Sequence, residues 1–238
     1  MSKPNFQFKQ FNIWHDKCAM KVNTDGILLG AWTKLNNPQS ILDIGTGTGL
    51  IALMLAQRTA EYNTKIMAVD IDRDTANQAL SNVNKSPFNS RIAVAHQDIL
   101  HPDLNLPKFD VIVCNPPYFV DALKTPDEKR NLARHTDSLS FESLIEVSEK
   151  LASEDSTLNL ILPVNEAELF LDLNKSSQWH LKSRCDVSHN ASKLPFRSLL
   201  QFSRSKIKTQ YDTLFLRNFD HSYSDAFTQL AKDFYLKM

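Results

Sequence analysis

All five glycines of the 238-residue chain lie between residues 26 and 49, and nearly 190 residues follow without one. Because glycine has no Cβ, it adopts backbone conformations that other residues avoid. The chain concentrates this freedom in one segment. Gly45, Gly47 and Gly49 form the spacing Gly-x-Gly-x-Gly between a short apolar run at 40–44 and a predicted helix at 50–58. We interpret this segment as a strand, a glycine turn and a helix.

Predicted strands alternate with predicted helices from residue 40 onward. The sequence predicts strands at 40–44, 65–70, 91–95, 109–114 and 158–162, and helices at 50–58, 74–84, 141–151 and 166–175. Three later strands, 181–187, 199–203 and 211–216, have short polar links that favour antiparallel pairing, and a last helix is predicted at 224–236. This alternation is typical of an α/β fold with a doubly wound, mostly parallel sheet.

The residues before the first of these strands are expected to form an arm. Residues 6–22 alternate aromatic or apolar with polar side chains, which predicts a hairpin or extended segment. Thr24-Asp25 is a plausible N-cap for a short helix at 26–34. We expect a single domain over 1–238, with the arm and helix in 1–36 and the core in 37–238.

Bulk composition limits the functional classes. With 42% hydrophobic residues and no apolar run near the roughly 18 residues of a membrane span, we expect a cytoplasmic protein without membrane contact. Cys18, Cys114 and Cys185 lie far apart without metal-site spacing, so we expect thiols and no metal. Because the formal net charge is zero, any nucleic-acid binding must rely on local basic patches.

Polar residues follow four consecutive predicted strands. The glycine turn follows the first strand, Asp70 ends the second, Asp98 follows the third, and Asn115-Pro116-Pro117-Tyr118 follows the fourth. Open α/β sheets build their sites at the carboxyl ends of strands, where a carboxylate such as Asp70 can bind both hydroxyls of a ribose. Asp98 is a candidate acceptor for adenine amino hydrogens. An amide beside a stacking ring suits a flat, amino-bearing substrate.

Each of these features has another interpretation. A dinucleotide site requires Gly-x-Gly-x-x-Gly, and position 50 is leucine, which disfavours NAD. A phosphate loop requires Gly-Lys-Ser/Thr, which does not follow the turn. The glycine turn alone could be ligand-free, Asp70 could cap a helix, and Asp98 could be a solvated loop residue. The ordered set of four strand ends, rather than any one of them, supports a site.

Taken in this order, the motifs in residues 40–120 resemble those of class I S-adenosylmethionine-dependent methyltransferases. The Asn115-Pro116-Pro117-Tyr118 turn is similar to that of amino-methyltransferases, which modify adenine N6, guanine N2 or a glutamine amide. The resemblance implies a seven-stranded Rossmann-like sheet with an antiparallel C-terminal strand pair, and S-adenosylmethionine as cofactor, with S-adenosylhomocysteine as product. It implies cofactor contacts by Asp25, Asp43, Gly45, Gly47, Gly49, Asp70, Ile71, Asp98 and Asn115.

The proline turn supplies the candidate catalytic residues. The side-chain oxygen of Asn115 and the backbone carbonyl of Pro116 can each accept one N–H of an amino group and hold its nitrogen toward the methyl donor. Tyr118 can stack on the base. This chemistry requires neither a metal nor a general base before methyl transfer, because the proton can leave afterwards.

The flanking segments make the resemblance more specific, because they point to one family of amino-methyltransferases. Residues 20–32, 130–135 and 233–237 resemble bacterial tRNA adenine-N6 methyltransferases that act on the adenosine 3′ of the anticodon, position 37, in tRNA(Val). The resemblance then covers nearly the whole chain, although Asn23 stands where glycine is expected in the family. It implies the anticodon loop of a tRNA as partner, and we expect a monomer.

Other functions remain open at this point. A protein glutamine N5-methyltransferase shares the proline turn, but such enzymes carry a sizeable helical domain before the glycine turn, where this chain has only about 40 residues. Another RNA adenine or guanine amino-methyltransferase is a further alternative. So is a non-catalytic nucleotide- or RNA-binding module, against which the intact Asn115 and Tyr118 argue.

Basic residues form three clusters in the sequence. These are Lys3, Lys9, Lys17 and Lys21; Lys124, Lys129, Arg130 and Arg134; and Lys193, Arg197, Arg204, Lys206 and Lys208. Phosphate binding is one interpretation, and ordinary solvated charge is the other. The RNA-binding candidates, together with Tyr118, are Lys124, Arg130, Arg134, Lys193 and Arg197.

Overall fold

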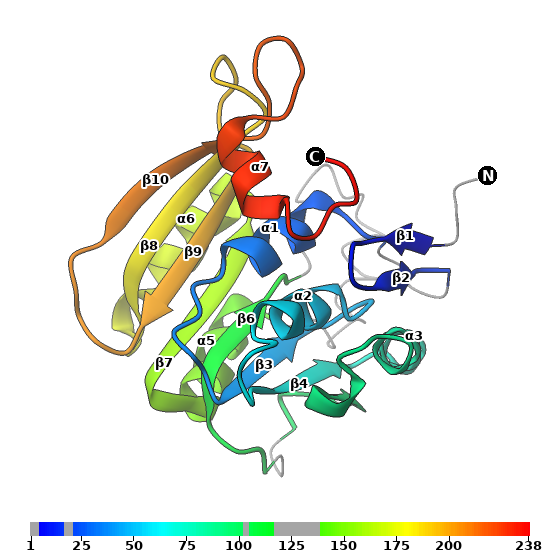
Figure 1. Cartoon of the computed structure of the whole chain (residues 1–238). Helices are drawn as coiled ribbons and strands as arrows, with labels where there is room; N and C mark the ends of the chain where they lie inside the picture. The colour runs from blue at the N-terminus through cyan, green and yellow to red at the C-terminus, as the bar shows by residue number, and fades with distance from the viewer. Residues whose placement is uncertain (1–4, 17–20, 102–104, 117–138) are drawn as a thin grey trace, which may run out of the picture.

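The structure is a computed structural model and describes residues 5–16, 21–101, 105–116 and 139–238. In these residues an eight-stranded sheet has the strand order β10-β8-β9-β7-β6-β3-β4-β5, and a separate two-stranded sheet pairs β1 with β2 (Figure 1). The larger sheet separates two hydrophobic cores. One lies under α1, α2, α7 and the N-terminal hairpin, and the other lies under α5 and α6.

Five parallel strands form the half of the sheet that begins with the glycine turn. They are β3 (Ser40–Ile44), β4 (Lys65–Asp70), β5 (Ile92–His96), β6 (Phe109–Cys114) and β7 (Ala152–Leu162). Their connections include α2 (Leu50–Arg58), α3 (Arg73–Asn84), η1 (Asn89–Arg91) and α5 (Phe141–Leu151). Strands covered on both faces require continuous apolar runs, and such runs predict most of these elements. Strand β7 begins six residues before its predicted start at 158, because its first residues are not an apolar run.

The C-terminal half of the sheet is mixed. It contains α6 (Val164–Leu173), η2 (Asn174–Ser176), β8 (His180–Ser188), β9 (Arg197–Ser203), β10 (Gln210–Phe215) and α7 (Asp225–Ala231). Strand β9 runs antiparallel to both β7 and β8, while β10 runs parallel to β8. The predicted α/β fold with an antiparallel C-terminal pair is therefore confirmed.

Strand β10 is where the fold departs from the expected pairing, and it brings the sheet to eight strands instead of seven. Both edges of β9 are already bonded, to β7 and to β8. The next strand therefore crosses to the free edge of β8, where it pairs in parallel with β8 instead of pairing antiparallel with β9.

The N-terminal arm forms the expected hairpin, with β1 (Asn5–Gln7) antiparallel to β2 (Asn12–Trp14). Its aromatic residues pack on the C-terminal segment. Phe8 is buried and pairs with Tyr235, and the backbone N–H of Lys9 donates to the carbonyl of Phe234 at 2.8 Å. Because the arm shares its core with α1 and α2, we propose that residues 1–238 form one domain.

Helix α1 (Thr24–Trp32) begins two residues before the predicted start. Its N-cap is Asn23, not Thr24-Asp25, because the Asn23 side-chain oxygen accepts the N–H of Gly26 at 2.9 Å. Asn23 has an extended backbone with φ −131°, so the position that departs from the resembled family makes no use of a positive φ. Gly26 and Gly30 let this helix pack closely against Leu50 and Met54 of α2.

Candidate active site

The glycine turn exposes bare backbone at the carboxyl edge of the sheet. Gly45, Gly47 and Gly49 have φ values of +67°, +58° and +81°, which L-residues with side chains rarely adopt. A Cβ built on Gly45 or Gly47 would meet no atom within 4 Å, whereas one on Gly49 would lie 3.5 Å from Ala79. The first two glycines therefore leave open space for a ligand, and the third packs the turn against α3.

Asp70 holds this turn from the neighbouring strand. Its Oδ2 accepts the N–H of Gly47 at 2.9 Å, and its Oδ1 accepts the N–H of Asp72 at 3.0 Å. Asp72, rather than Asp70, caps α3 by accepting the N–H of Thr75, which removes the helix-cap interpretation of Asp70. Since each carboxylate oxygen can accept more than one bond, Asp70 keeps acceptor capacity for a ligand hydroxyl.

Two carboxyl groups near the turn have unusual acidity. Asp43 is fully buried beneath the turn, and this burial raises its pKa to about 7, despite a bond of 2.6 Å from the Thr46 hydroxyl to its Oδ2. Burial also raises the pKa of Asp70, against the lowering effect of the Asp72 and Gly47 N–H groups. Negative charge at this edge is therefore costly without a cation.

Asn115 lies next to the glycine turn. Strands β3, β4 and β6 end level with one another, so the residues that follow or close them, Gly45, Asp70 and Asn115, lie side by side at one edge. Adjacent strands are about 4.8 Å apart, so this row brings the predicted residues together. Asn115 is half-buried and Pro116 is buried, whereas Tyr118 lies outside the described residues.

The end of β5 completes the edge with Asp98, which is half-buried and accepts the N–H of Leu100 at 2.9 Å through Oδ1. Ile71, directly after Asp70, exposes its side chain and offers an apolar surface beside the carboxylate. The His96 ring nitrogen Nε2 lies 3.0 Å from the carbonyl oxygen of Ile71. This contact indicates a structural role for His96.

Asp25 and Arg197 were predicted as separate cofactor and RNA contacts, but they bond to each other. Arg197 Nε donates to Asp25 Oδ2 at 2.8 Å, and both side chains are largely covered. A second guanidinium nitrogen of Arg197 donates to the carbonyl of Phe196. The pair joins α1 to the start of β9, and the predicted cofactor and RNA contacts of its two members stay predictions.

The third basic cluster does not form one patch, because β9 separates its members. Lys193 lies in the exposed loop before β9, whereas Arg204, Lys206 and Lys208 follow its other end. Among the other RNA-binding candidates, Lys124, Arg130 and Arg134 lie outside the described residues.

Asn82 is a site residue that the sequence analysis missed. It is fully buried, and its Nδ2 donates to the carbonyls of Thr48 at 2.9 Å and Trp14 at 2.8 Å, while its Oδ1 accepts the N–H of Trp14 at 3.0 Å. One side chain thus ties the glycine turn to the N-terminal hairpin. The sequence feature that could have identified Asn82 is its place on the helix. It lies three positions after Ala79, on the face of α3 that is buried.

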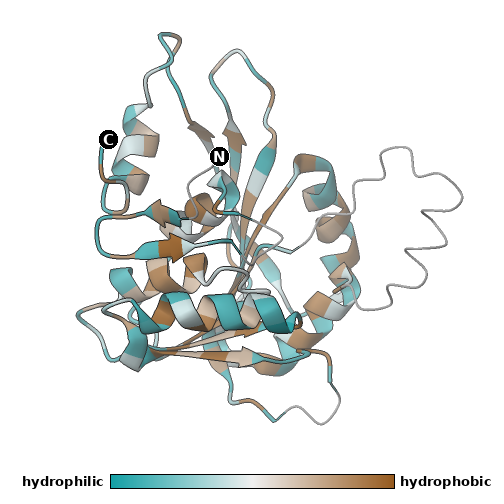
Figure 2. Cartoon of the chain, turned by 90° about the vertical axis from the view of Figure 1, so that its right-hand side faces the viewer, coloured by the Kyte–Doolittle hydropathy of each residue, from teal (hydrophilic) through white to brown (hydrophobic). Residues whose placement is uncertain are grey.

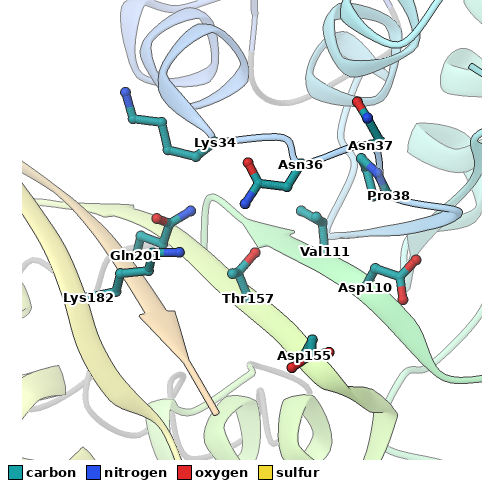
Figure 3. A pocket seen from close by; sticks show the side chains of 10 residues that line it. All are labelled: Lys34, Asn36, Asn37, Pro38, Asp110, Val111, Asp155, Thr157, Lys182 and Gln201. Carbon is teal, nitrogen blue, oxygen red and sulfur yellow. The ribbon is translucent and has the colours of Figure 1, made fainter. Parts of the chain in front are cut away.

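A cavity of about 250 Å³ lies at the opposite, amino-terminal edge of the sheet (Figure 3). Asn36, Asp110, Thr157 and Gln201 are among its lining residues. Asp110 accepts the backbone N–H groups of Gln39 and Ser40 through Oδ2, and the Ser153 hydroxyl through Oδ1. This cavity is separate from the row of Gly45, Asp70 and Asn115.

In the part of the chain that the structure describes, no group of three or more His, Cys, Asp or Glu is placed to hold a metal ion. Cys114 and Cys185 are buried free thiols, and burial raises the pKa of Cys185 to about 11. No helix in the same ranges has both the length and the apolar character to cross a membrane.

Comparison with known proteins agrees with this geometry. Residues 23–138 match the Methyltransferase small domain family. The chain is 49% identical to a tRNA1(Val) (adenine(37)-N6)-methyltransferase of Parabacteroides distasonis, and 45% identical to one of Bacteroides fragilis, over the full length of all chains. A solved structure of a predicted O-methyltransferase from Agrobacterium tumefaciens shares the fold, with a TM-score of 0.69 and 16% identity over 88% of this chain and 96% of that one.

The structural match confirms the methyltransferase fold, and the sequence matches are far more specific. The relationship covers all 238 residues of this chain and the full length of both relatives. The chain belongs to the family of tRNA1(Val) (adenine(37)-N6)-methyltransferases.

Proposed function

We propose that this protein transfers a methyl group from S-adenosylmethionine to N6 of adenosine 37 in tRNA(Val). The observation that carries the proposal is the level row of Gly45, Asp70 and Asn115, in which a nucleoside cradle adjoins an acceptor for an amino group. The activity named for the full-length relatives supports the same substrate.

The residues of the row fit the cofactor. The open space over Gly45 and Gly47 admits a ligand against the backbone, and Asp70 retains capacity for ribose hydroxyls. Ile71 would pack on the adenine ring, and Asp98 would accept its amino hydrogens. Gly49 shapes the turn, and a cationic ligand near Asp43 would favour the ionised form of this buried carboxyl group. When bound, S-adenosylmethionine supplies a methyl group on a positively charged sulfur.

Asn115 and Pro116 orient the substrate. An exocyclic adenine nitrogen is a poor nucleophile because its lone pair is delocalised into the ring. The Asn115 side-chain oxygen and the Pro116 carbonyl accept its two N–H groups, which aims the nitrogen and localises the lone pair as the nitrogen becomes tetrahedral. The two groups are preorganised, because Pro116 is buried and has a restricted φ. Tyr118 stacks on the base.

Labelled S-adenosylmethionine and total tRNA from a strain that lacks this protein provide the direct test. We expect N6-methyladenosine at position 37 of tRNA(Val), detected by nucleoside mass analysis, and no further methylation of tRNA from the parent strain. Methylation of a glutamine-containing peptide instead of tRNA would overturn the proposal. Cofactor binding without turnover of any RNA would favour a binding module.

We also propose that the enzyme acts in the cytoplasm, where its tRNA substrate is found, and that it acts as a monomer. Sedimentation of the protein alone and with tRNA measures the assembly state. A catalytic species containing two copies would contradict the second statement.

A further inference from the structure

Two loops project together beyond the ends of β8 and β10 (Figures 1 and 2). Because β8 and β10 run parallel to β6, these loops leave the same edge of the sheet as Asn115. Residues 189–196 join β8 to β9, and residues 216–224 join β10 to α7. Their bases are bonded, because Arg217 N–H donates to the carbonyl of His189 at 2.9 Å and Leu216 N–H to that of Ser188 at 3.0 Å. We call these two segments the two-loop surface.

The two-loop surface carries apolar side chains that the fold does not bury. Leu194 is 89% exposed and Phe219 is 74% exposed, the highest values among the large hydrophobic residues that the structure describes. A single exposed apolar residue needs no explanation, but two on loops with a shared base indicate an interaction surface.

The loop that carries Phe219 is held in shape. Asn218 N–H donates to the carbonyl of Ser222 at 2.9 Å, and the N–H and hydroxyl of Ser222 both donate to Asp220. His221 adopts a positive φ of +67°. A rigid loop that presents an exposed ring loses little conformational entropy on binding.

The chemistry of the surface fits an unpaired nucleic acid. The Arg217 guanidinium lies 4.6 Å from the centroid of the Tyr223 ring, and Lys193 is exposed on the other loop. The one carboxylate of the two loops, Asp220, accepts the bonds of Ser222. Exposed rings with nearby cations bind single-stranded bases by stacking and phosphates by charge.

The position of the surface connects it to the candidate active site. Strand β8 is three strands from β6 and parallel to it, and β10 is four strands from β6. At a strand spacing of about 4.8 Å, the bases of the loops lie roughly 15–20 Å from Asn115 along the sheet edge. An RNA whose target base enters the site can extend its neighbouring nucleotides over this distance.

We propose that the two-loop surface binds unpaired nucleotides of the anticodon loop, with Phe219 as the stacking platform. This inference rests on the proposed function, since it assumes a tRNA substrate. Phe219 acts in RNA binding and not in the transfer step, so its loss raises KM for RNA while kcat at saturating RNA is retained.

The test compares Phe219→Ala with Tyr211→Ala in the full chain. Tyr211 is also aromatic and 70% exposed, but it lies at the opposite end of β10. Binding of an anticodon-arm hairpin is measured by fluorescence anisotropy, with a fully paired duplex as a second probe. We expect Phe219→Ala to bind the hairpin about 5- to 150-fold more weakly, with no change for the duplex or for Tyr211→Ala.

Further measurements separate this role from a structural one. Affinity for S-adenosylmethionine and the thermal midpoint should be equal in both variants. If the two variants bind the hairpin with equal affinity and the wild type methylates tRNA normally, the proposal for the two-loop surface is wrong but the proposed function stands. A wild type that methylates no tRNA overturns both. If Phe219→Ala changes only the sedimentation of the protein, the occupant is a second copy and the RNA proposal is wrong.

Discussion

The two edges of the sheet contain similar polar residues but use them differently. At the carboxyl edge, Asp70 and Asn115 flank backbone that a ligand can approach, because the turn beside them consists of glycines with positive φ. At the amino edge, Asp110 and Gln201 line a cavity and Asp110 accepts bonds from Gln39, Ser40 and Ser153, but no glycine with a positive φ lies beside them in the described residues. Strand direction and open backbone, rather than polar composition, therefore distinguish a candidate active site.

The largest effect is expected for Asn115→Ala, with Asn36→Ala at the amino edge as the matched control. Loss of one preorganised acceptor should lower kcat by about 100- to 1,000-fold, on the scale seen when a transition-state hydrogen bond is removed. Labelled methyl transfer to tRNA measures kcat, and calorimetry should find cofactor affinity retained. Unchanged kcat in Asn115→Ala would contradict the proposed mechanism. An equal loss of kcat in Asn36→Ala would show that the two edges do not differ in function.

A second pair compares Asp70→Ala with Asp110→Ala, two aspartates that each accept two backbone N–H groups. Hydrogen bonds to a charged group contribute about 1.5–3 kcal/mol, so Asp70→Ala should bind S-adenosylmethionine roughly 10- to 150-fold more weakly. Asp110→Ala should lower the free energy of unfolding and leave cofactor affinity unchanged. Calorimetry and urea unfolding measure the two quantities, and wild-type affinity in Asp70→Ala would remove Asp70 from the site.

The third prediction concerns pH, because the pKa of Asp43 is raised from 3.8 to about 7. The native state then holds a proton that the unfolded chain has released, so the free energy of unfolding falls as pH rises from about 4 to 7. The slope for one proton is at most about 1.4 kcal/mol per pH unit, or tenfold in the unfolding equilibrium. Urea unfolding of Asp43→Asn should show a smaller decline, to which Asp70 still contributes, whereas the exposed control Asp155→Asn should keep the full decline. Parallel pH profiles for Asp43→Asn and wild type would contradict the assignment.

The smallest effect is expected in the salt dependence of tRNA binding, which compares the two ends of β9. Lys193→Ala should reduce the slope of log affinity against log salt by about 0.7–0.9, the contribution of one phosphate contact. Lys208→Ala should leave the slope unchanged. Filter binding at several salt concentrations measures both, and equal slopes for the two variants would show that neither end is favoured.

The sequence predicted the carboxyl edge because its signals are local. Three local patterns indicate where a parallel strand ends: an apolar run, a glycine spacing and a double proline. Neighbouring parallel strands then bring these ends together at one edge of the sheet. The Asp25–Arg197 pair joins residues 172 positions apart, and the partner of β10 depends on which strand edge remains free. These pairings depend on tertiary packing. The two-residue repeat of strands and the 3.6-residue repeat of helices, which the sequence shows, do not encode them. The Asn23 cap and Asn82 were missed for a related reason, since each depends on where one side chain points.

The bonds of Asn82 have a consequence for how the protein responds to its cofactor. Its amide is shared between the carbonyl of Thr48 in the glycine turn and both backbone groups of Trp14 in β2. Any ligand that holds the glycine turn in one conformation also lowers the frequency with which the hairpin detaches, and by thermodynamic reciprocity a docked hairpin strengthens the binding of that ligand. The backbone amide of Trp14 should therefore exchange its hydrogen with solvent more slowly when the cofactor is bound, although Trp14 itself is not among the proposed cofactor contacts.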